Sequence, residues 1–266
     1  MPERAIGVFD SGVGGLTVLR ELLRQLPNEP LVYLGDTARV PYGSKSPQTV
    51  LRYAGEAARF LVAQRVKLLV VACNTASAVA LPTLASAHRL PVVGVIAPGV
   101  RRALDVSRNR RIGVIGTEGT IRSGAYETAL KAGDPRVDVF SAACPLFVPL
   151  AEEGWMAHPA ATLIATDYLG PLLDHGIDTL VLGCTHYPLL KETLQQVVGP
   201  TVQLIDSAEE TAKAVAGELC RFDLRRPESD QPAARYFVTD IPDRFERVGG
   251  TFLGAPLSGV GTVTLD

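Results

Sequence analysis

Short apolar runs rich in β-branched residues alternate along the chain with longer segments in which apolar residues recur every three or four positions. Runs of the first kind predict buried strands, and segments of the second kind predict amphipathic helices. The predicted strands cover residues 5–9, 31–34, 68–72, 92–96, 112–115, 137–140, 180–183, 202–205 and 235–239. The clearest predicted helices cover residues 16–26, 49–63, 160–173, 188–198 and 214–222. Because strands that alternate with helices are typical of βαβ units, the pattern predicts an α/β fold with mainly parallel sheets.

The same pattern occurs twice. The first four predicted strands reappear in the same order, each between 106 and 112 residues further along the chain. In both halves the third strand runs directly into a cysteine, Cys73 in the first half and Cys184 in the second. The repeat predicts two similar α/β domains related by pseudo-twofold symmetry, with the active site in the cleft between them. We expect the last strand to return to the first domain, which gives one domain of residues 1–97 plus 213–266 and another of residues 98–212.

The composition is that of a globular protein with a sizeable core, since 47% of the 266 residues are apolar and 20% are charged. The net charge of −2 gives no general electrostatic reason to expect nucleic acid or an anionic membrane as a partner. No apolar stretch approaches the ~18–20 residues of a membrane span, and no signal-type segment opens the chain, so a cytoplasmic location is expected. Four cysteines are too few for a disulfide scaffold, so reduced thiols are expected. The polar stretch at residues 225–232 predicts an exposed loop.

Cys73 and Cys184 fall at the carboxyl ends of predicted parallel strands, where ligands collect in such sheets. N–H groups at the start of a following helix would favour the thiolate and lower the pKa of each thiol, which would make it a usable base. A lone cysteine after an apolar run is usually a small buried hydrophobic residue, as we predict for Cys144 and Cys220. The matched pair favours a functional role, because residues able to hydrogen-bond a ligand follow both cysteines. These residues are Asn74 and Thr75 in the first half, and Thr185 and His186 in the second.

A glycine-rich turn at residues 10–15 follows the first predicted strand. A tight βα turn explains the glycines by itself, and a dinucleotide fold is an alternative, since Asp36 follows the second strand near the position of a ribose-binding acid. The G-x-G-x-x-G spacing fails, however, because Thr17 occupies the third glycine position, and no Walker A lysine is present. Asp10 stands where it would repel a phosphate, so it is better suited to binding an ammonium group or orienting a thiol.

Three further positions are candidates of different strength. Residues 41–43 follow the second strand and could be only a loop turn. Glu152 has an acidic neighbour, and adjacent acids are usually solvated. His186 is a stronger candidate, because an imidazole two residues from a base can tune that base or donate a proton. No cysteine–histidine spacing resembles a structural zinc site, so no metal is expected.

At these positions the chain resembles the glutamate racemases, within the cofactor-independent aspartate/glutamate racemase superfamily. The resemblance rests on residues 7–15, 33–37 with 41–43, 72–76, 116–120, 147–154 and 183–188, which occur in family order over nearly the whole chain. It implies that Cys73 and Cys184 are the two acid/base catalysts, and that Asp10, Glu152 and His186 assist proton transfer. It also implies a set of substrate-binding residues: Asp10, Ser11, Pro41, Tyr42, Gly43, Asn74, Thr75, Thr185 and His186.

The resemblance further implies a cofactor-independent interconversion of L- and D-glutamate, in which one thiol removes the α-proton and the other delivers a proton to the opposite face. Cys73 is implied to act on the D-enantiomer and Cys184 on the L-enantiomer. Aspartate and hydantoin racemases are similar in carrying an acid where this chain has His186, so the histidine points to glutamate. The product D-glutamate would feed peptidoglycan synthesis, and a homodimer is the common arrangement in such families.

Three alternatives stay open at the level of the sequence. An aspartate or related amino-acid racemase would use the same pair of thiols. A nucleotide-dependent oxidoreductase would use the glycine-rich turn and Asp36, and a two-lobed binding protein would hold a ligand between the cysteines without exchanging its α-proton. Neither of the last two explains the matched cysteines, whereas a site with two activated thiols does.

Overall fold

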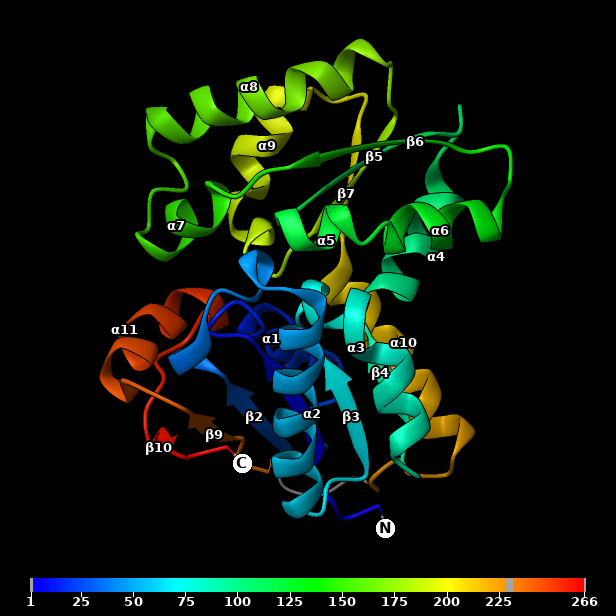
Figure 1. Ribbon diagram of the computed structural model, residues 1–266. Helices are drawn as coiled ribbons and strands as arrows, with labels where there is room; N and C mark the ends of the chain where they lie inside the picture. Colours follow the sequence, from blue (N-terminus) through cyan, green and yellow to red (C-terminus); the bar gives the residue numbers. More distant parts are fainter. Residues whose placement is uncertain (1, 228–231, 266) are drawn as a thin grey trace.

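The computed structural model describes residues 2–227 and 232–265, which form two stacked lobes (Figure 1). The first lobe, in blue, cyan, orange and red, is built on a six-stranded sheet, and the second lobe, in green and yellow, is built on a four-stranded sheet. Neighbouring strands are parallel throughout both sheets. The predicted α/β class with two parallel sheets is therefore confirmed.

The two sheets share one strand order. The first sheet has the order β10-β9-β2-β1-β3-β4, with β1 (Ile6–Asp10), β2 (Leu31–Gly35), β3 (Leu68–Val71), β4 (Val92–Gly94), β9 (Arg235–Val238) and β10 (Gly261–Thr262). The second has the order β6-β5-β7-β8, with β5 (Arg111–Gly116), β6 (Asp138–Ala143), β7 (Thr179–Gly183) and β8 (Gln203–Asp206). In each lobe the first four strands lie in the order second, first, third, fourth, so the sequence repeat is also a repeat of topology.

Helices cover both faces of each sheet. Alternate residues of a strand point to opposite faces, and they belong to different buried clusters, each of which also contains helix residues. Those of the first lobe are α1 (Leu16–Gln25), α2 (Pro47–Ala63), α3 (Asn74–Ala87), α10 (Ser207–Arg221) and α11 (Pro242–Leu253). Those of the second are α4 (Ile96–Val106), α5 (Glu118–Arg122), α6 (Ala125–Gly133), α7 (Phe147–Glu152), α8 (Pro159–Asp174) and α9 (Lys191–Val198). The short 3₁₀ helices are η1 (Thr37–Arg39), η2 (Tyr42–Ser44) and η3 (Tyr187–Leu190).

The predicted strands and helices are present, and the differences lie at their ends. The helix predicted from residue 188 begins as η3 and becomes α-helical only at Lys191. Helix α10 begins earlier than predicted, because the Asp206 side chain accepts the N–H of Ala208 and caps it. Strand β9 pairs with β2, so the chain does return to the first lobe. Strand β10 has two residues, too few to give a hydrophobic pattern.

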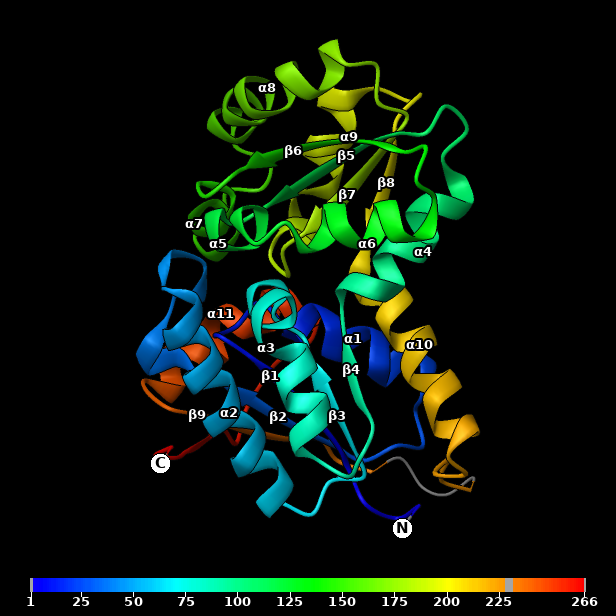
Figure 2. The ribbon, with the colours of Figure 1, turned by 45° about the vertical axis from the view of Figure 1, so that its right-hand side comes forward.

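The chain crosses between the lobes after β4 and again after β8. After the second crossing, α10 runs down the side of the first lobe beside α1 (Figure 2). Ala212 and Val215 of α10 share a buried cluster with Leu19 and Leu22 of α1. The predicted boundary between residues 212 and 213 thus falls inside α10, and the division into two domains stays a prediction.

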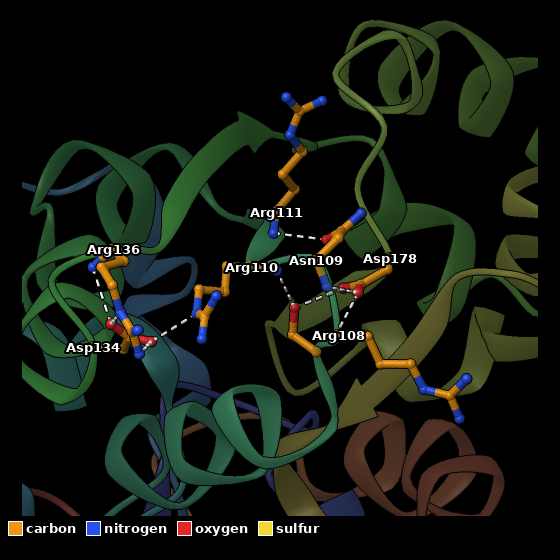
Figure 3. A network of polar contacts seen from close by, with 8 residues as sticks. Arg108, Asn109, Arg110, Arg111, Asp134, Arg136 and Asp178 are labelled. Atoms are coloured by element: carbon orange, nitrogen blue, oxygen red, sulfur yellow. Dashed lines mark hydrogen bonds and ion pairs between the residues drawn. The ribbon is translucent and has the colours of Figure 1, made fainter.

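The residue before the strand that leads to each cysteine is charged and buried or hydrogen-bonded, but its contacts differ between the two lobes. In the first lobe the buried Lys67 ammonium pairs with Glu29 at the start of β3. In the second lobe Asp178 accepts the backbone N–H groups of Arg108 and Asn109 at 2.7 and 2.8 Å, and the Ser107 hydroxyl at 2.7 Å (Figure 3). Both contacts lie at the amino ends of the strands, so they fix where each strand begins, away from its cysteine.

Three sequence-level expectations meet the structure at other points. All four cysteines are free thiols, as expected. Within the described residues, no helix combines the length and apolar character needed to cross a bilayer. Of the loop predicted at residues 225–232, residues 228–231 lie outside the described part of the chain.

Candidate active site

The central strands of the two sheets end at one interface between the lobes. Cys73 follows β3 in the first lobe and Cys184 follows β7 in the second. Burial is the main cause of the raised pKa of Cys73, and a smaller contribution comes from the charge of Cys184, so the two sulfurs lie within electrostatic reach of each other. Across the same interface the Thr75 hydroxyl lies 2.9 Å from that of Thr117 and 3.1 Å from that of Thr120. The repeat predicts such a meeting of the two cysteine-bearing turns.

Cys73 is the buried N-cap residue of α3. Its Sγ accepts the N–H of Ala76 at 3.5 Å and lies 3.8 Å from Ser11 Oγ. Burial, with a smaller contribution from the Asp10 carboxylate, raises the pKa of this thiol to about 12, against the lowering effects of Ala76 and Ser11. The expectation of a lowered pKa is therefore wrong for Cys73. The helix does supply an N–H group, but burial beside an acid outweighs it.

Cys184 begins a chain of polar contacts that reaches the surface. Its Sγ lies 3.8 Å from His186 Nδ1, and His186 Nε2 lies 3.2 Å from Glu152 Oε1. The other carboxylate oxygen of Glu152 accepts a hydrogen bond from the half-exposed Arg244 at 3.2 Å. Burial opposes a charge on His186, but its contacts with Cys184 and Glu152 outweigh burial and raise its pKa to about 10. The sequence predicts that N–H groups of a following α-helix stabilise the Cys184 thiolate, but the short 3₁₀ helix η3 follows Cys184 instead. The charged group next to this sulfur is the His186 imidazole.

Two buried polar atoms near Cys73 have no hydrogen-bond partner among the described residues. Asp10 Oδ2 accepts the N–H of Gly12 at 2.9 Å, but its Oδ1 is unpaired. Asn74 Oδ1 accepts the hydroxyl of Tyr126 at 2.6 Å, but its Nδ2 is unpaired. Burial raises the pKa of Asp10, and the charge of His186 opposes this effect. Because unpaired buried polar groups are costly, one free acceptor and one free donor indicate a place for a ligand with an ammonium and a carboxylate.

The turn after β2 packs closely on the second lobe. A Cβ atom on Gly43 would lie 2.6 Å from Thr117 Cβ, so this approach requires glycine. Pro41 and Gly43 line a surface groove together with Thr117 and Val148 of the second lobe. Thr117 belongs both to this groove and to the threonine cluster, so the groove lies between the lobes next to Thr75.

Asp36 is committed to contacts inside the first lobe. Its buried carboxylate accepts the hydroxyl groups of Tyr42 and Thr239 and pairs with Arg39. A ribose-binding acid must be free to reach its ligand, so this arrangement disfavours the oxidoreductase alternative. It also engages the Tyr42 hydroxyl, so any contact of Tyr42 with a substrate would use other atoms of that residue.

Known proteins resemble this chain over most of its length. Residues 6–215 match the model of the family described as Asp/Glu/Hydantoin racemase. A glutamate racemase of Geobacter metallireducens is 59% identical over 266 residues, which cover 100% of this chain and 98% of that protein. The chain belongs to the Asp/Glu/hydantoin racemase family.

Solved structures of glutamate racemases are similar to this member of the Asp/Glu/hydantoin racemase family along its whole length. That of Bacillus anthracis is 42% identical with a TM-score of 0.96, and the match covers 99% of this chain and 98% of that chain. That of Francisella tularensis, in complex with D-glutamate, is 40% identical with a TM-score of 0.94, and the match covers 100% and 99% of the two chains. The resemblance inferred from the sequence motifs is therefore confirmed at the level of the family.

The roles of individual residues in this racemase-family chain stay predictions, but their positions are clear. Among the predicted site residues, those grouped at the interface of the lobes are Asp10, Ser11, Cys73, Asn74, Thr75, Glu152, Cys184, Thr185 and His186. Sequence reasoning did not single out Thr117, Thr120, Tyr126 or Arg244, because their contacts cross from one lobe to the other. Two signals point to these threonines: both lie in the segment 116–120 that carries the family resemblance, and the repeat offset of 106 residues maps Ser11 onto Thr117.

Removing the charge of Glu152 should lower the pKa of His186. In Glu152→Gln we expect a fall of about one unit or more, because a neighbouring carboxylate favours the imidazolium. The charged imidazole contributes stability that is complete below the unfolded-state pKa of ~6.5 and is lost as the pH rises towards about 10. The variant should lose this contribution at a lower pH. NMR titration of the His186 ring and urea unfolding between pH 6 and 10 measure both effects.

Glu153→Gln is the matched control, because the neighbouring Glu153 side chain is exposed and is not a partner of His186 in the contacts described. It should leave the titration of His186 unchanged. An equal shift in both variants would mean that general surface charge, rather than the contact with Glu152, sets this pKa.

Proposed function

We propose that this chain interconverts L- and D-glutamate without a cofactor, with the thiols of Cys73 and Cys184 as its two acid/base groups. One observation carries the proposal: two buried cysteines, one from each lobe, stand at matched strand ends of a single interface, within electrostatic reach of each other. The names of the relatives support the substrate, since the Geobacter protein is a glutamate racemase and the Francisella protein was solved with D-glutamate.

The proposed reaction balances within the pair of thiols. One sulfur, present as a thiolate, takes the α-proton and becomes a thiol. The opposite thiol gives its proton to the other face of the carbanion and becomes a thiolate. The roles exchange with the handedness of the substrate, so that Cys73 deprotonates D-glutamate and Cys184 deprotonates L-glutamate. Proton transfer contributes only about 10²–10⁴-fold, so hydrogen-bond donors to the substrate carboxylate must also stabilise the carbanion.

The unpaired polar atoms suggest how the amino acid binds. We infer that Asp10 Oδ1 accepts from the substrate ammonium and that Asn74 Nδ2 donates to a carboxylate oxygen, which would pair both atoms. Ser11, Thr75 and Thr185 offer hydroxyl groups nearby, and the turn with Pro41, Tyr42 and Gly43 would close over the substrate. On the Cys184 face, His186 and Glu152 assist proton transfer. On the Cys73 face, Asp10 has this role.

The burial of both sulfurs gives the lobes a role in substrate entry. Since both cysteines are buried, we infer that the lobes part to admit glutamate and close again to exclude water. We propose that residues 1–97 plus 213–266 and residues 98–212 are the units that move. We also propose that the protein works in the cytoplasm as a homodimer and supplies D-glutamate for peptidoglycan synthesis.

Incubation with L-glutamate in D₂O tests the proposal. The optical rotation should decay to zero while deuterium enters the α-position, because the delivered proton comes from a thiol that exchanges with solvent. L-Aspartate should react about 10- to 200-fold more slowly in terms of kcat/KM, the usual discrimination for one methylene. Binding without α-exchange would support the two-lobed binding protein instead, and faster turnover of L-aspartate would make aspartate the substrate.

A further inference from the structure

Two hydroxyl groups reach across the lobe interface in opposite directions. Thr17, on α1 of the first lobe, donates to the backbone carbonyl of Thr185 in the second lobe at 3.0 Å. Tyr126, on α6 of the second lobe, donates to Asn74 Oδ1 in the first lobe at 2.6 Å. All four residues are buried, so both hydrogen bonds are shielded from water.

The two hydrogen bonds are reciprocal with respect to the cysteines. Thr185 directly follows Cys184, and Asn74 directly follows Cys73. Each lobe therefore sends one hydroxyl group to the residue that follows the cysteine of the other lobe. Both bonds therefore join a cysteine-bearing turn to the opposite lobe.

Close packing accompanies each of the two contacts. A Cβ atom on Gly14 would lie 2.3 Å from Thr185 Oγ1, so the turn before Thr17 also touches the segment after Cys184. A Cβ atom on Gly183 would lie 3.0 Å from the Tyr126 ring, so this ring packs against the residue before Cys184. Tyr126 thus contacts the residue after one cysteine and the residue before the other.

We propose that Thr17 and Tyr126 are positioning residues, which hold the two cysteine-bearing turns at the separation and orientation that proton transfer across the substrate requires. The inference rests on the proposed racemase function. Neither hydroxyl is a catalytic group, because Thr17 is bonded to the carbonyls of Gly14 and Thr185, and Tyr126 is bonded to Asn74. Thr17 acts on the Cys184 face through Thr185, and Tyr126 acts on the Cys73 face through Asn74.

The proposal predicts a signature in the primary isotope effects of α-deuterated glutamate. If Thr17→Val slows proton transfer at Cys184, abstraction becomes more rate-limiting for the enantiomer that Cys184 deprotonates, and its isotope effect on kcat/KM rises. For the other enantiomer Cys184 acts in the later step, so the isotope effect falls. Tyr126→Phe should show the mirrored pattern, because it disturbs the Cys73 face.

The experiment measures kcat/KM and both isotope effects for the full chain, Thr17→Val and Tyr126→Phe, together with the melting temperature of each. We expect each variant to lose about 3- to 10-fold in kcat/KM, the effect of one lost buried hydrogen bond. Thr17→Ser keeps the hydroxyl and should restore both isotope effects, which keeps the test open if the valine variant folds poorly. Thr193→Val removes a similar buried hydroxyl, bonded to the Met156 carbonyl at 2.6 Å within the second lobe, and should leave both isotope effects unchanged.

Parental isotope effects in Thr17→Val and Tyr126→Phe would overturn the proposal, whether or not kcat/KM falls, because a smaller folded fraction changes the rate without changing which step limits it. Isotope effects that move in the same direction for both enantiomers would also overturn it. If the unmodified chain fails to racemise glutamate in this assay, the proposed function fails instead, so the two failures are distinguishable.

Discussion

Replacing Cys73 or Cys184 with alanine should abolish racemisation of glutamate. Each face of the α-carbon has one thiol in the proposed reaction, so the loss of either leaves one face without a proton acceptor and donor. We expect kcat/KM to fall by at least about 10²–10⁴-fold, the usual contribution of a general acid/base group. Optical rotation and α-deuterium incorporation in D₂O, followed for both enantiomers, measure the two half-reactions separately.

Cys220→Ala is the control for these variants, because Cys220 is exposed on α10, away from the lobe interface. It should keep parental turnover. Both active-site variants should keep the parental fold, since the change removes a single sulfur atom. Parental rates in Cys73→Ala or in Cys184→Ala would contradict the two-thiol mechanism, even if glutamate remains the substrate.

Replacing Glu29 with glutamine should strongly lower the free energy of unfolding, more than the other substitutions proposed for this chain. The ammonium of Lys67 is fully buried and pairs with Glu29, whose other oxygen accepts the N–H of Arg226. Removal of one partner leaves an uncompensated buried charge, which costs about 3–5 kcal/mol in the free energy of unfolding. Urea unfolding at neutral pH, with the slope compared between variant and parent, measures this loss.

Glu127→Gln provides the matched control, because Glu127 pairs with Lys131 on the surface with both side chains about half exposed. Such a pair is worth about 0–1 kcal/mol, so this variant should unfold close to the parental midpoint. Equal losses in the two variants would show that burial of the Lys67 pair has no special effect. Glu29 precedes β2 and Lys67 precedes β3, so both lie at the amino ends of strands, and the folded fraction of Glu29→Gln should keep its activity.

The sequence was sufficient for the fold because the hydrophobic runs are short, regular and repeated. The errors lie at the ends of elements: α10, for example, begins at Ser207 although the pattern predicts a helix from residue 214. Such an error lengthens or shortens an element without changing which elements the chain contains or their order. The repeat also predicts that the two halves share one strand order, as the structure shows, although the order itself is known only from the structure. The two-residue strand β10 was missed because its pairing depends on β9 and not on its own sequence.

Site residues that follow directly after a strand could be predicted from the sequence. Residues that act through contacts between the lobes could not. Cys73, Cys184 and Asp10 follow from position alone. Thr17 was noted only because it breaks a dinucleotide motif, yet its hydroxyl reaches Thr185 in the other lobe. The pKa of Cys73 was predicted with the wrong sign, because the local N–H group is visible in the sequence while burial beside Asp10 is not.

The polar chain from Cys184 through His186 and Glu152 to Arg244 makes the two faces of the site unequal. Within the described residues, the sulfur of Cys73 has only neutral hydrogen-bond partners, Ser11 and Ala76. Arg244 is half exposed, so dissolved salt can weaken its contact with Glu152, whereas the hydrogen-bond partners of Cys73 in the described part of the chain carry no charge. Ionic strength should therefore act more strongly on the Cys184 face than on the Cys73 face, so two strand ends with one repeated topology differ in how well they are insulated from the surrounding medium.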